Sequence, residues 1–446
     1  MTTMKVERRP EYWPGIPHVE YKGSSAPLGF SFDFYNPDKV IDGKPWKDHM
    51  NNSIALWHLR SGLSDMFGGN TRNIVFSSDP FENSVHWLYA MEEAAVKLRM
   101  THFAGHDNDA LWAGISLKER ALTMPRIEEV LLEIMDRSGL KPLWWTQDLF
   151  TAPVFRDGAA TSPYKDVQEL ALAQAFIALR TSKIIGAPGH TLWGGREGFG
   201  SLLNTRISKE LDAYANFIWA VYNYGEKIGY KGDYYIEPKT FEPTIVQYDA
   251  DVATIYAFLQ HYGFAKTGRF KINFEVNHGD LGGKRAEDQV ALAIHYGILG
   301  SIDGNQGDSP VGFDTDRQAA DVIIPAKMFM PIIASGGLGK GGINWDAKAR
   351  GQSHTVEDLF HGKILSLDTY AQGYMIAMHA NRLLEPMLNQ RYSDSVLCTD
   401  NALTDPEAFL RQMAEKQPLE LRSGQQEYYE RLFNKAMAAA YAEMAA

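Results

Sequence analysis

The sequence predicts a (β/α)8 barrel, in which eight parallel strands alternate with helices. Two observations lead to this fold class. Short apolar or aromatic runs alternate with longer amphipathic stretches, which implies parallel pairing through right-handed helical crossovers. Polar residues also gather at the C-terminal ends of the runs, where barrel enzymes carry their active sites. A doubly wound open sheet is the alternative that the same alternation allows.

Eight runs along the chain have the length and composition expected of strands. They cover, in order, residues 53–59, 98–106, 141–148, 189–195, 232–238, 269–277, 297–303 and 341–346. Amphipathic stretches fill most of the gaps between them, for example residues 165–186 and 251–264. Eight such units favour a closed barrel over an open sheet.

After about residue 385 the alternation stops, and the rest of the chain reads as helices and loops. We therefore predict a catalytic barrel with an N-terminal extension over residues 1–385, and a helical C-terminal extension over residues 386–446. The extension is too small for a large core, so it is expected to pack on the barrel or in subunit contacts. A loosely attached surface tail is the alternative. Apolar residues at helical spacing argue against it, namely Leu432, Phe433, Met437 and Tyr441.

The composition is that of an ordinary globular protein, with 45% hydrophobic and 22% charged residues among 446. The formal net charge of −11 disfavours binding to nucleic acid or to an anionic membrane. The single cysteine, Cys398, excludes an intrachain disulfide and fits a reducing compartment. The first residues lack an apolar signal core, and no apolar run approaches the ~20 residues of a membrane span. These features predict a cytoplasmic protein.

Six carboxylates, one histidine and one lysine follow the later predicted strands. They are Glu237, Lys239, Glu275, His278, Asp303, Asp314, Asp316 and Asp346. Two like charges about 4 Å apart interact by roughly 4 kcal/mol at an effective dielectric near 20. Six carboxylates can therefore share one cavity only if cations lie between them. The series predicts two divalent cations per subunit, and oxygen ligands with one imidazole suit Mg²⁺, Mn²⁺ or Co²⁺.

For the pairs Glu237–Lys239 and Glu275–His278, a purely structural role is an alternative to metal binding. Glu237 and Lys239 share one face of a strand, and a surface ion pair is the alternative for them. Glu275 and His278 are three residues apart, so they converge only if the strand ends near Val276 and the chain turns. A lone histidine is more often structural, so this pair alone is moderate evidence.

The aspartates need the same comparison. Asp314 and Asp316 face one way in an extended loop, but an Asx turn or a helix cap would also explain them. Asp303 and Asp346 each end an apolar run and are weak signals singly. Their value lies in their joint order along the chain and in their placement at strand ends.

His106 and Asp109 follow the second predicted strand. A histidine with a nearby carboxylate is a proton-transfer unit, because the carboxylate fixes the tautomer and the orientation of the ring. The alternative is a buried structural histidine. Three aromatic residues also lie at strand ends, and flat rings there suit the C–H faces of a sugar, although core packing explains any one of them equally well. These residues are Trp57, Phe150 and Trp193.

Several motifs resemble those of the xylose isomerases, in particular the longer bacterial type. They are WGGREG (193–198), IEPK (236–239), QYDADVATIYAFL (247–259), GFDTD (312–316) and GGINWDAK (341–348). The likeness runs from about residue 35 to about residue 380. It implies an isomerase, an intramolecular oxidoreductase, that interconverts an aldose (xylose or a related sugar) and its ketose by a metal-assisted 1,2-hydride shift. It also implies a homo-oligomer, either a tetramer or a dimer.

The resemblance gives each candidate residue an expected role. It implies that one cation is held by Glu237, Glu275, Asp303 and Asp346, and the other by Glu275, His278, Asp314 and Asp316. Lys239 would donate a hydrogen bond to the carbonyl oxygen, and His106, supported by Asp109, would assist ring opening. The aromatic residues would enclose the substrate. Phe67 resembles an aromatic that reaches into the site of a neighbouring subunit.

The sequence departs from the family pattern around these residues. Gly105 stands where the family usually has an aromatic, and an NLF-like turn reads QDLF, which brings in Asp148. Residues 282–289 read GGKRAEDQ in place of an AGH-aromatic-His-Glu pattern, and Gln306 replaces an arginine. We expect the catalytic residues to be kept, with a preferred sugar other than xylose. Within the altered segment, Lys284 and Arg285 either favour an anionic sugar or form a solvated loop.

Three other functions are weighed against an isomerase. A sugar epimerase on the same barrel would work by deprotonation and reprotonation. A metal-dependent phosphodiesterase acting on DNA would need a basic groove and several metal-binding histidines, which the charge of −11 and one strong histidine ligand disfavour. A non-catalytic sugar-binding protein would need a damaged set of metal ligands, which the sequence does not show.

Overall fold

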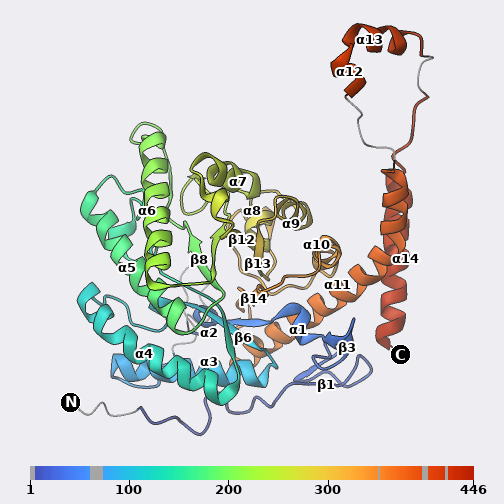
Figure 1. Ribbon diagram of the computed structural model, residues 1–446. Coiled ribbons are helices and arrows are strands. Elements are labelled where there is room, and N and C mark those ends of the chain that lie inside the picture. Colours follow the sequence, from blue (N-terminus) through green and yellow to red (C-terminus); the bar gives the residue numbers. More distant parts are fainter. Residues whose placement is uncertain (1–5, 61–73, 350–351, 394–399, 417–419, 446) are drawn as a thin grey trace.

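The computed structural model describes residues 6–60, 74–349, 352–393, 400–416 and 420–445. Within these ranges, eight parallel strands close into a barrel, in the spatial order β5-β6-β7-β8-β10-β12-β13-β14 and back to β5 (Figure 1). The strands are β5 (Ser53–Ala55), β6 (His102–His106), β7 (Lys141–Thr146), β8 (Gly189–Trp193), β10 (Asp233–Glu237), β12 (Phe270–Glu275), β13 (Leu299–Asp303) and β14 (Ile343–Trp345). The predicted fold class is confirmed, and the doubly wound open sheet is excluded.

Helices surround the barrel and connect its strands (Figure 1). They are α2 (Leu56–Arg60), α3 (Pro80–Lys97), α4 (Leu117–Ser138), α5 (Lys165–Ile184), α6 (Ile207–Ile228), α7 (Val252–His261), α8 (Val276–Leu281), α9 (Ala286–His295), α10 (Ile323–Ala334) and α11 (Val356–Arg391). Local sequence fixes several of their ends. Ser116 and Glu119 form a reciprocal capping box before α4, and Gly139 ends that helix with a positive φ of 75°. Thr355 and Asp358 cap α11 in the same way.

Shorter elements decorate this frame. They are β1 (Glu20–Tyr21), β2 (Ser31–Phe32), β3 (Val40–Ile41), β4 (Lys44–Pro45), α1 (Lys47–Met50), β9 (Gly198–Phe199) and β11 (Val246–Gln247), with 3-10 turns at Asp107–Asp109, Pro153–Phe155, Phe264–Thr267 and Ser309–Val311. The N-terminal extension is tied to the barrel helices. Both carboxylate oxygens of Glu93 in α3 accept backbone N–H bonds, from Tyr12 at 2.7 Å and from Trp13 at 3.0 Å.

The first strand is shorter than expected. The run 53–59 was expected to be one strand, but β5 ends at Ala55 and α2 begins at Leu56. Leu56 and Leu59 are both buried and lie three residues apart, which fits a helix better than a strand. This turn places Trp57 on α2 above the barrel instead of along a strand.

The C-terminal region consists of α11, α12 (Asp400–Thr404), α13 (Pro406–Ala414) and α14 (Gln426–Ala445). Figure 1 shows α14 running alongside α11, with α12 and α13 beyond their far ends. Phe433 of α14 is buried, and the other apolar residues predicted for this face pack against the same core, namely Leu432, Met437 and Tyr441. The predicted boundary at residue 385 falls inside α11, and the division of the chain into two parts stays a prediction.

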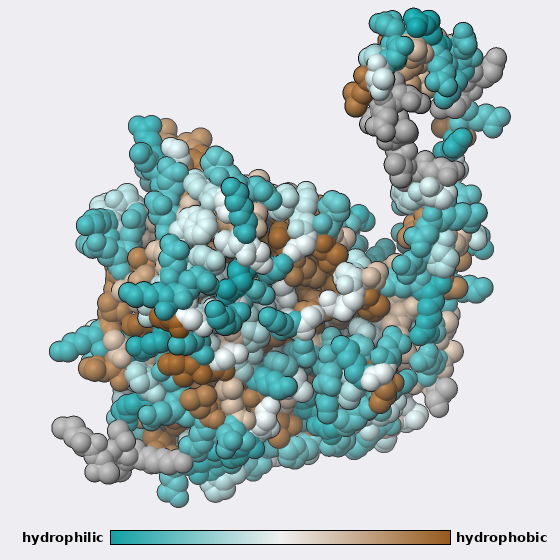
Figure 2. All heavy atoms as spheres, in the orientation of Figure 1, coloured by the Kyte–Doolittle hydropathy of each residue, from teal (hydrophilic) through white to brown (hydrophobic). Residues whose placement is uncertain are grey.

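Hydrophilic residues cover most of the face shown in Figure 2, with hydrophobic residues in smaller patches between them. None of the helices within the described ranges combines the length and the apolar character that a membrane crossing requires.

Candidate metal and sugar site

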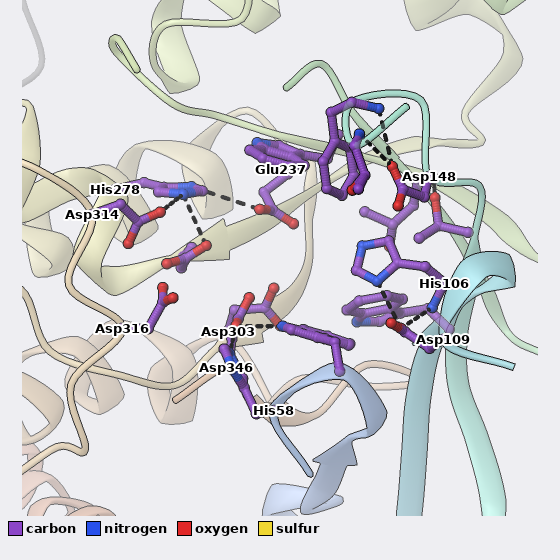
Figure 3. A pocket seen from close by; sticks show the side chains of 18 of the residues that line it. His58, His106, Asp109, Asp148, Glu237, His278, Asp303, Asp314, Asp316 and Asp346 are labelled. Atoms are coloured by element: carbon purple, nitrogen blue, oxygen red, sulfur yellow. Dashed lines mark hydrogen bonds and ion pairs between the residues drawn. The ribbon is translucent and has the colours of Figure 1, made fainter. Parts of the chain in front are cut away.

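The acidic residues predicted from the sequence meet at the C-terminal mouth of the barrel. Glu237 is the last residue of β10, Glu275 of β12 and Asp303 of β13, and Asp346 follows β14 directly. The register sets Glu275 beside Asp303 on the neighbouring strand. Parallel strands bring their carboxyl ends to one side, so the barrel itself places these acids together (Figure 3).

Two further carboxylates reach the same place from a loop. Asp314 and Asp316 lie in the connection between β13 and α10, and Asp316 has a positive φ of 45°. Figure 3 shows Asp314 beside His278 and Asp316 on the same side of the pocket. The residues are therefore part of the site, and not a helix cap, since α10 begins only at Ile323.

The oxygen atoms are close enough to bind cations. Within the described residues, four groups each offer donor atoms that all lie within 4.8 Å of one another, namely Glu237–Glu275–His278, Glu275–Asp303–Asp346, Glu275–Asp314–Asp316 and His58–Asp316–Asp346. Glu275 belongs to three of them. A carboxylate has two oxygens, so Glu275 can bridge two ions. The donor set is mostly oxygen with imidazole, which fits Mg²⁺, Mn²⁺ or Co²⁺.

His278 is oriented as a ligand would be. Because β12 ends at Glu275 and α8 begins at Val276, the chain turns and brings the imidazole back over the strand end. Its Nδ1 lies 3.1 Å from the carbonyl of Pro238, to which Nδ1–H donates. Its Nε2 then carries the lone pair, 3.0 Å from Glu275 Oε2 and 3.1 Å from Asp314 Oδ2. A lone pair that faces two carboxylates fits a site for a cation between them.

The crowding of acids appears in their pKa values. Burial raises the pKa of Glu237, Glu275, Asp303 and Asp316 well above the usual range, and neighbouring carboxylates add to this. Burial acts on Asp314 in the same direction and is the largest effect, but Lys239 and His278 together outweigh it and hold the pKa of that carboxyl well below its ordinary value. The site thus lacks positive charge for most of its acids.

Amide side chains support the acids from beneath, and they were missed from the sequence. Asn273 donates to Glu237 Oε2 and to Asp303 Oδ2, both at 2.8 Å, and Asn344 donates to Asp303 Oδ1 at 2.9 Å. Asn273 lies two residues before Glu275, and Asn344 two before Asp346, so strand alternation alone places each amide on the face of its acid. A search for polar residues at this spacing inside the apolar runs would have found both.

His58 and Lys348 were also missed. His58 and Trp57 donate from Nε2 and Nε1 to the same oxygen, Asp346 Oδ1, the tryptophan bond measuring 3.0 Å. Burial lowers the pKa of His58 to about 4, so its imidazole is neutral and the bond is that of a donor to a carboxylate. Lys348 lies 3.2 Å from Asp316 Oδ2. Its position two residues after Asp346 was the signal available in the sequence.

Lys239 lies behind the acids and is not among the described residues that line the cavity. Its ammonium is 2.8 Å from Asp314 Oδ2 and 3.2 Å from Glu242 Oε2. It also stands 5.3 Å from the centre of the Trp193 ring. Its side chain is buried, and its attachment to the site is through Asp314.

The predicted aromatic residues surround a cavity of about 330 Å³ next to the acids. Phe150 meets Trp193 edge to face, with ring centres 4.4 Å apart, and the Trp57 ring lies 5.5 Å from that of Trp144. The cavity is lined on one side by these rings and on the other by the carboxylates. Such a mixed wall suits a small polyol. Phe67, the last predicted aromatic, lies outside the described residues.

His106 and Asp109 form the expected pair on the side of the cavity away from the acids (Figure 3). Asp109 Oδ2 accepts from the backbone N–H of His106 at 2.7 Å and from its Nδ1 at 2.9 Å. Burial alone would lower the pKa of His106, but Asp109 reverses the effect and the pKa is raised to about 9. The imidazole is therefore protonated near neutral pH.

The positions that depart from the family pattern lie in different surroundings. Asp148 lines the cavity, and its carboxylate accepts from Asn108 Nδ2 at 2.8 Å. Gly105 does not line it, because it alternates with His106 along β6 and faces outward. A Cβ on Gly105 would lie 2.9 Å from the Trp145 ring on the adjacent strand, so that tryptophan fills the space an aromatic at 105 would need.

The remaining departures are at the periphery. Lys284 pairs with Asp251, Arg285 lies 2.7 Å from Asp288 and is mostly exposed, and neither lines the cavity. Gln306 accepts backbone N–H bonds before α10 through its side chain. Lys284 and Arg285 thus give no support to the idea of an anionic sugar. Among these positions, Asp148 is the one that lines the cavity.

The sequence is similar to those of curated xylose isomerases. A xylose isomerase of Thermotoga petrophila is 38% identical over 444 residues, which cover 97% of this chain and 99% of that protein. A xylose isomerase of Caldicellulosiruptor bescii is 38% identical over 438 residues, covering 96% of this chain and 99% of the relative. Among solved structures, an L-ribulose 3-epimerase matches 75% of the chain with a TM-score of 0.47 and 14% identity. No protein-family model matches the sequence.

Proposed function

The chain belongs to the xylose isomerase family, and from this premise we propose that it interconverts an aldose and the corresponding ketose with two bound divalent cations. The observation that carries the proposal is the buried Glu275, which takes part in three groups of closely spaced metal donors at the mouth of the barrel. A sugar-sized cavity adjoins those donors.

The proposed ligands form two sets that would share Glu275. We propose that Glu237, Glu275, Asp303 and Asp346 hold one cation, and that Glu275, His278, Asp314 and Asp316 hold the other. When bound, the cations would supply Lewis-acid polarisation of the sugar oxygens. They would also neutralise carboxylates that burial and mutual repulsion leave without enough positive charge.

His106 would act on the ring form of the sugar. Asp109 fixes Nδ1, so Nε2 is free to face the cavity, and the raised pKa keeps a proton available there at neutral pH. This proton would be donated to the ring oxygen as the ring opens, which places His106 in the role of a general acid.

Lys239 would bind the open chain. An ammonium has three N–H donors, and Asp314 and Glu242 account for two of them. The third would donate to the carbonyl oxygen of the sugar once the side chain moves from behind Asp314 into the cavity, which it does not line in this structure. A positive charge there favours the negative charge that develops on this oxygen during isomerisation.

Isomerisation would transfer the hydrogen on C2, with its electron pair, to C1. The C2 hydroxyl loses a proton and becomes the ketone, and the oxygen on C1 gains a proton and becomes the hydroxyl, so the reaction needs no redox cofactor. The rings of Trp57, Phe150 and Trp193 would cover the carbon chain and exclude water during this step.

The test is a panel of aldoses and ketoses, assayed after chelation and again after adding Mg²⁺, Mn²⁺ or Co²⁺. We expect activity to depend on the cation, and Glu275→Gln to abolish it, whereas Lys284→Met, which changes a residue outside the cavity, leaves it intact. Efficient turnover of xylose above all other sugars would contradict the altered sugar preference. Activity unchanged by chelation would overturn the metal-dependent mechanism itself.

Deuterium at C2 separates isomerase from epimerase. A hydride shift retains the label in the product, whereas deprotonation and reprotonation exchange it with solvent. Loss of the label to solvent would replace the proposed reaction by epimerisation on the same site. Assembly into a dimer or tetramer and a cytoplasmic location stay predictions, which sedimentation and cell fractionation test.

A further inference from the structure

A buried lysine of α11 lies beneath the end of β14. Lys363 has no exposed surface, and its ammonium donates to the carbonyl of Trp345 at 2.8 Å and to the carbonyl of Ala347 at 2.6 Å. These two carbonyls belong to the residues on either side of Asp346. One side chain thus holds the backbone both before and after a proposed metal ligand.

The backbone at this point forms two successive tight turns. The N–H of Asp346 donates to the carbonyl of Asn344 at 3.0 Å, and the N–H of Ala347 donates to the carbonyl of Trp345 at 2.9 Å. Bonds between residues two apart define three-residue turns. The carbonyl of Trp345 accepts from both Ala347 and Lys363, so the lysine is bonded directly to the turn.

The turn is linked to the rest of the site. The carbonyl of Asp346 accepts from Asn305 Nδ2 at 2.8 Å, and the same amide donates to Glu275 Oε1 at 2.7 Å. A small movement of the turn would therefore displace the Asp346 carboxylate and loosen Glu275. Ligand displacements of this kind weaken metal binding even when every ligand is still present.

We propose that Lys363 is a positioning residue, which fixes the turn at Asp346 so that its carboxylate can bind a cation. The inference rests on the proposed metal site, which it deepens. Burying an ammonium is costly, and the hydrogen-bond partners of Lys363 are neutral carbonyls, while Asp346 and Asp316 offset the cost only in part. An apolar side chain would avoid this cost but would hold neither carbonyl. The cost is explained if the lysine holds the turn at Asp346 in the position that cation binding requires.

The experiment measures cation binding to metal-free protein by titration calorimetry with Mn²⁺, together with the melting temperature. Lys363→Met removes the donors and keeps the length of the side chain. We expect this substitution to lower the affinity for one of the two ions by roughly 10- to 100-fold, the range seen when residues behind metal ligands are changed. Lys363→Gln, which keeps amide donors on a shorter side chain, is expected to show a loss in the same direction and provides the readout if the methionine variant does not fold.

Lys97 provides a matched control, because it is also a buried lysine that donates to a backbone carbonyl, that of Trp13 at 2.8 Å. Lys97→Met should lower the melting temperature and leave both ions bound as in the wild type. A second control tests whether Lys363 acts through Asp346. Asp346→Asn should lower the affinity for the same ion, and adding Lys363→Met to that variant should lower this affinity little further.

The outcomes are distinguishable. If a folded Lys363 variant binds both ions as tightly as the wild type, Lys363 is merely structural and the inference is wrong. Full additivity of the two substitutions would likewise show that the lysine does not act through Asp346. If the wild-type protein itself binds no divalent cation, the proposed function is wrong, and the inference about Lys363 is wrong with it.

Discussion

At the scale of single residues, the charge of His106 is set by its neighbour. Its pKa of about 9 reflects burial, which lowers the value, and nearby carboxylates, which more than offset it, Asp109 most and Asp148 and Asp346 less. A group whose folded-state pKa is raised stabilises the protein fully below its ordinary pKa near 6.5, and this contribution is lost as the pH rises through about 9.

Asp109→Asn should therefore shift the pH dependence of catalysis. In the wild type we expect kcat/KM for cyclic sugars to fall as the pH rises through about 9, where His106 loses its proton. Without the carboxylate, the falling limb should move down by about two pH units or more, towards the ordinary histidine range. Asp288→Asn, a surface change, should leave the profile in place. An unchanged profile in Asp109→Asn would show that His106 does not supply the proton.

Asp148, which departs from the family pattern and lines the cavity, is hydrogen-bonded to Asn108. Asp148 Oδ2 accepts from Asn108 Nδ2 at 2.8 Å, while its Oδ1 accepts the N–H of Thr151 at 2.9 Å. Asp148→Asn would set two amide NH₂ groups against each other, at a cost of about 1–3 kcal/mol in the free energy of unfolding.

The exchange Asn108→Asp with Asp148→Asn should restore most of that loss, because the hydrogen bond is remade with donor and acceptor reversed. Arg120, which donates to Asn108 Oδ1 at 2.6 Å, can donate equally to a carboxylate there. Urea unfolding of the two single variants and the double variant measures the coupling. Additive losses in the double variant would mean that the pair contributes no interaction of its own.

At the scale of elements, the strands could be predicted well and their ends less so. All eight apolar runs contain a barrel strand, because a strand buried on both faces shows as a continuous apolar stretch. The ends depend on tertiary contacts. Residues 56–59 are helical although they continue an apolar run, since Leu56 and Leu59 pack in the core while Trp57 and His58 face the site.

The same reasoning separates the predicted from the missed site residues. Most of the acids stand at strand ends. Several charged residues at such places, with few basic residues beside them, can be recognised in the sequence. Asn273 and His58 are single polar residues within or beside apolar runs, and only the closed barrel shows that they donate to Glu237 and Asp346. Gly105 illustrates the reverse case, because the sequence suggests a change at the substrate, whereas the strand places it against Trp145.

The packing of α14 on α11 can be tested with one substitution. Phe433 is 5% exposed in the core between these helices, whereas Tyr428 on the same helix is 47% exposed. Phe433→Ala should lower the free energy of unfolding by about 3–5 kcal/mol, because it leaves a cavity. Tyr428→Ala should change it by only about 0.5 kcal/mol. Equal effects of the two in denaturant titrations would contradict a packed C-terminal helix.

At the scale of the whole molecule, the clustered acids couple stability to pH and to cations. Four carboxyls have raised pKa values, namely Glu237, Glu275, Asp303 and Asp316. Over the range above the ordinary value near 4, they hold protons in the folded protein that the unfolded chain has released, so stability falls as pH rises. Asp314 and Asp346 have lowered values, and their contribution is already complete in this range.

The metal-free protein should therefore melt at a higher temperature near about pH 5 than near about pH 8. Excess Mg²⁺ or Mn²⁺ should raise the melting temperature most at the higher pH, since deprotonated ligands bind cations better. Binding at 100 times the dissociation constant adds about 2.7 kcal/mol per site. Melting curves across this range with chelator and with cation provide the measurement. Burial lowers the pKa of His58, His102 and His278, which favours the higher pH. A metal-free protein that is most stable at the higher pH would therefore mean that these histidines outweigh the four acids.

Closure of the barrel also bears on when the protein can acquire its cations during synthesis. β14 completes the ring by pairing with β5, Asn344 opposite Ser53 and Trp345 opposite Ile54, although nearly 300 residues separate them. Asp346 is the last proposed ligand to leave the ribosome, and its partners Trp57 and His58 are made far earlier. A nascent chain shorter than 346 residues cannot assemble the complete site, so full metallation has to follow translation of the last strand.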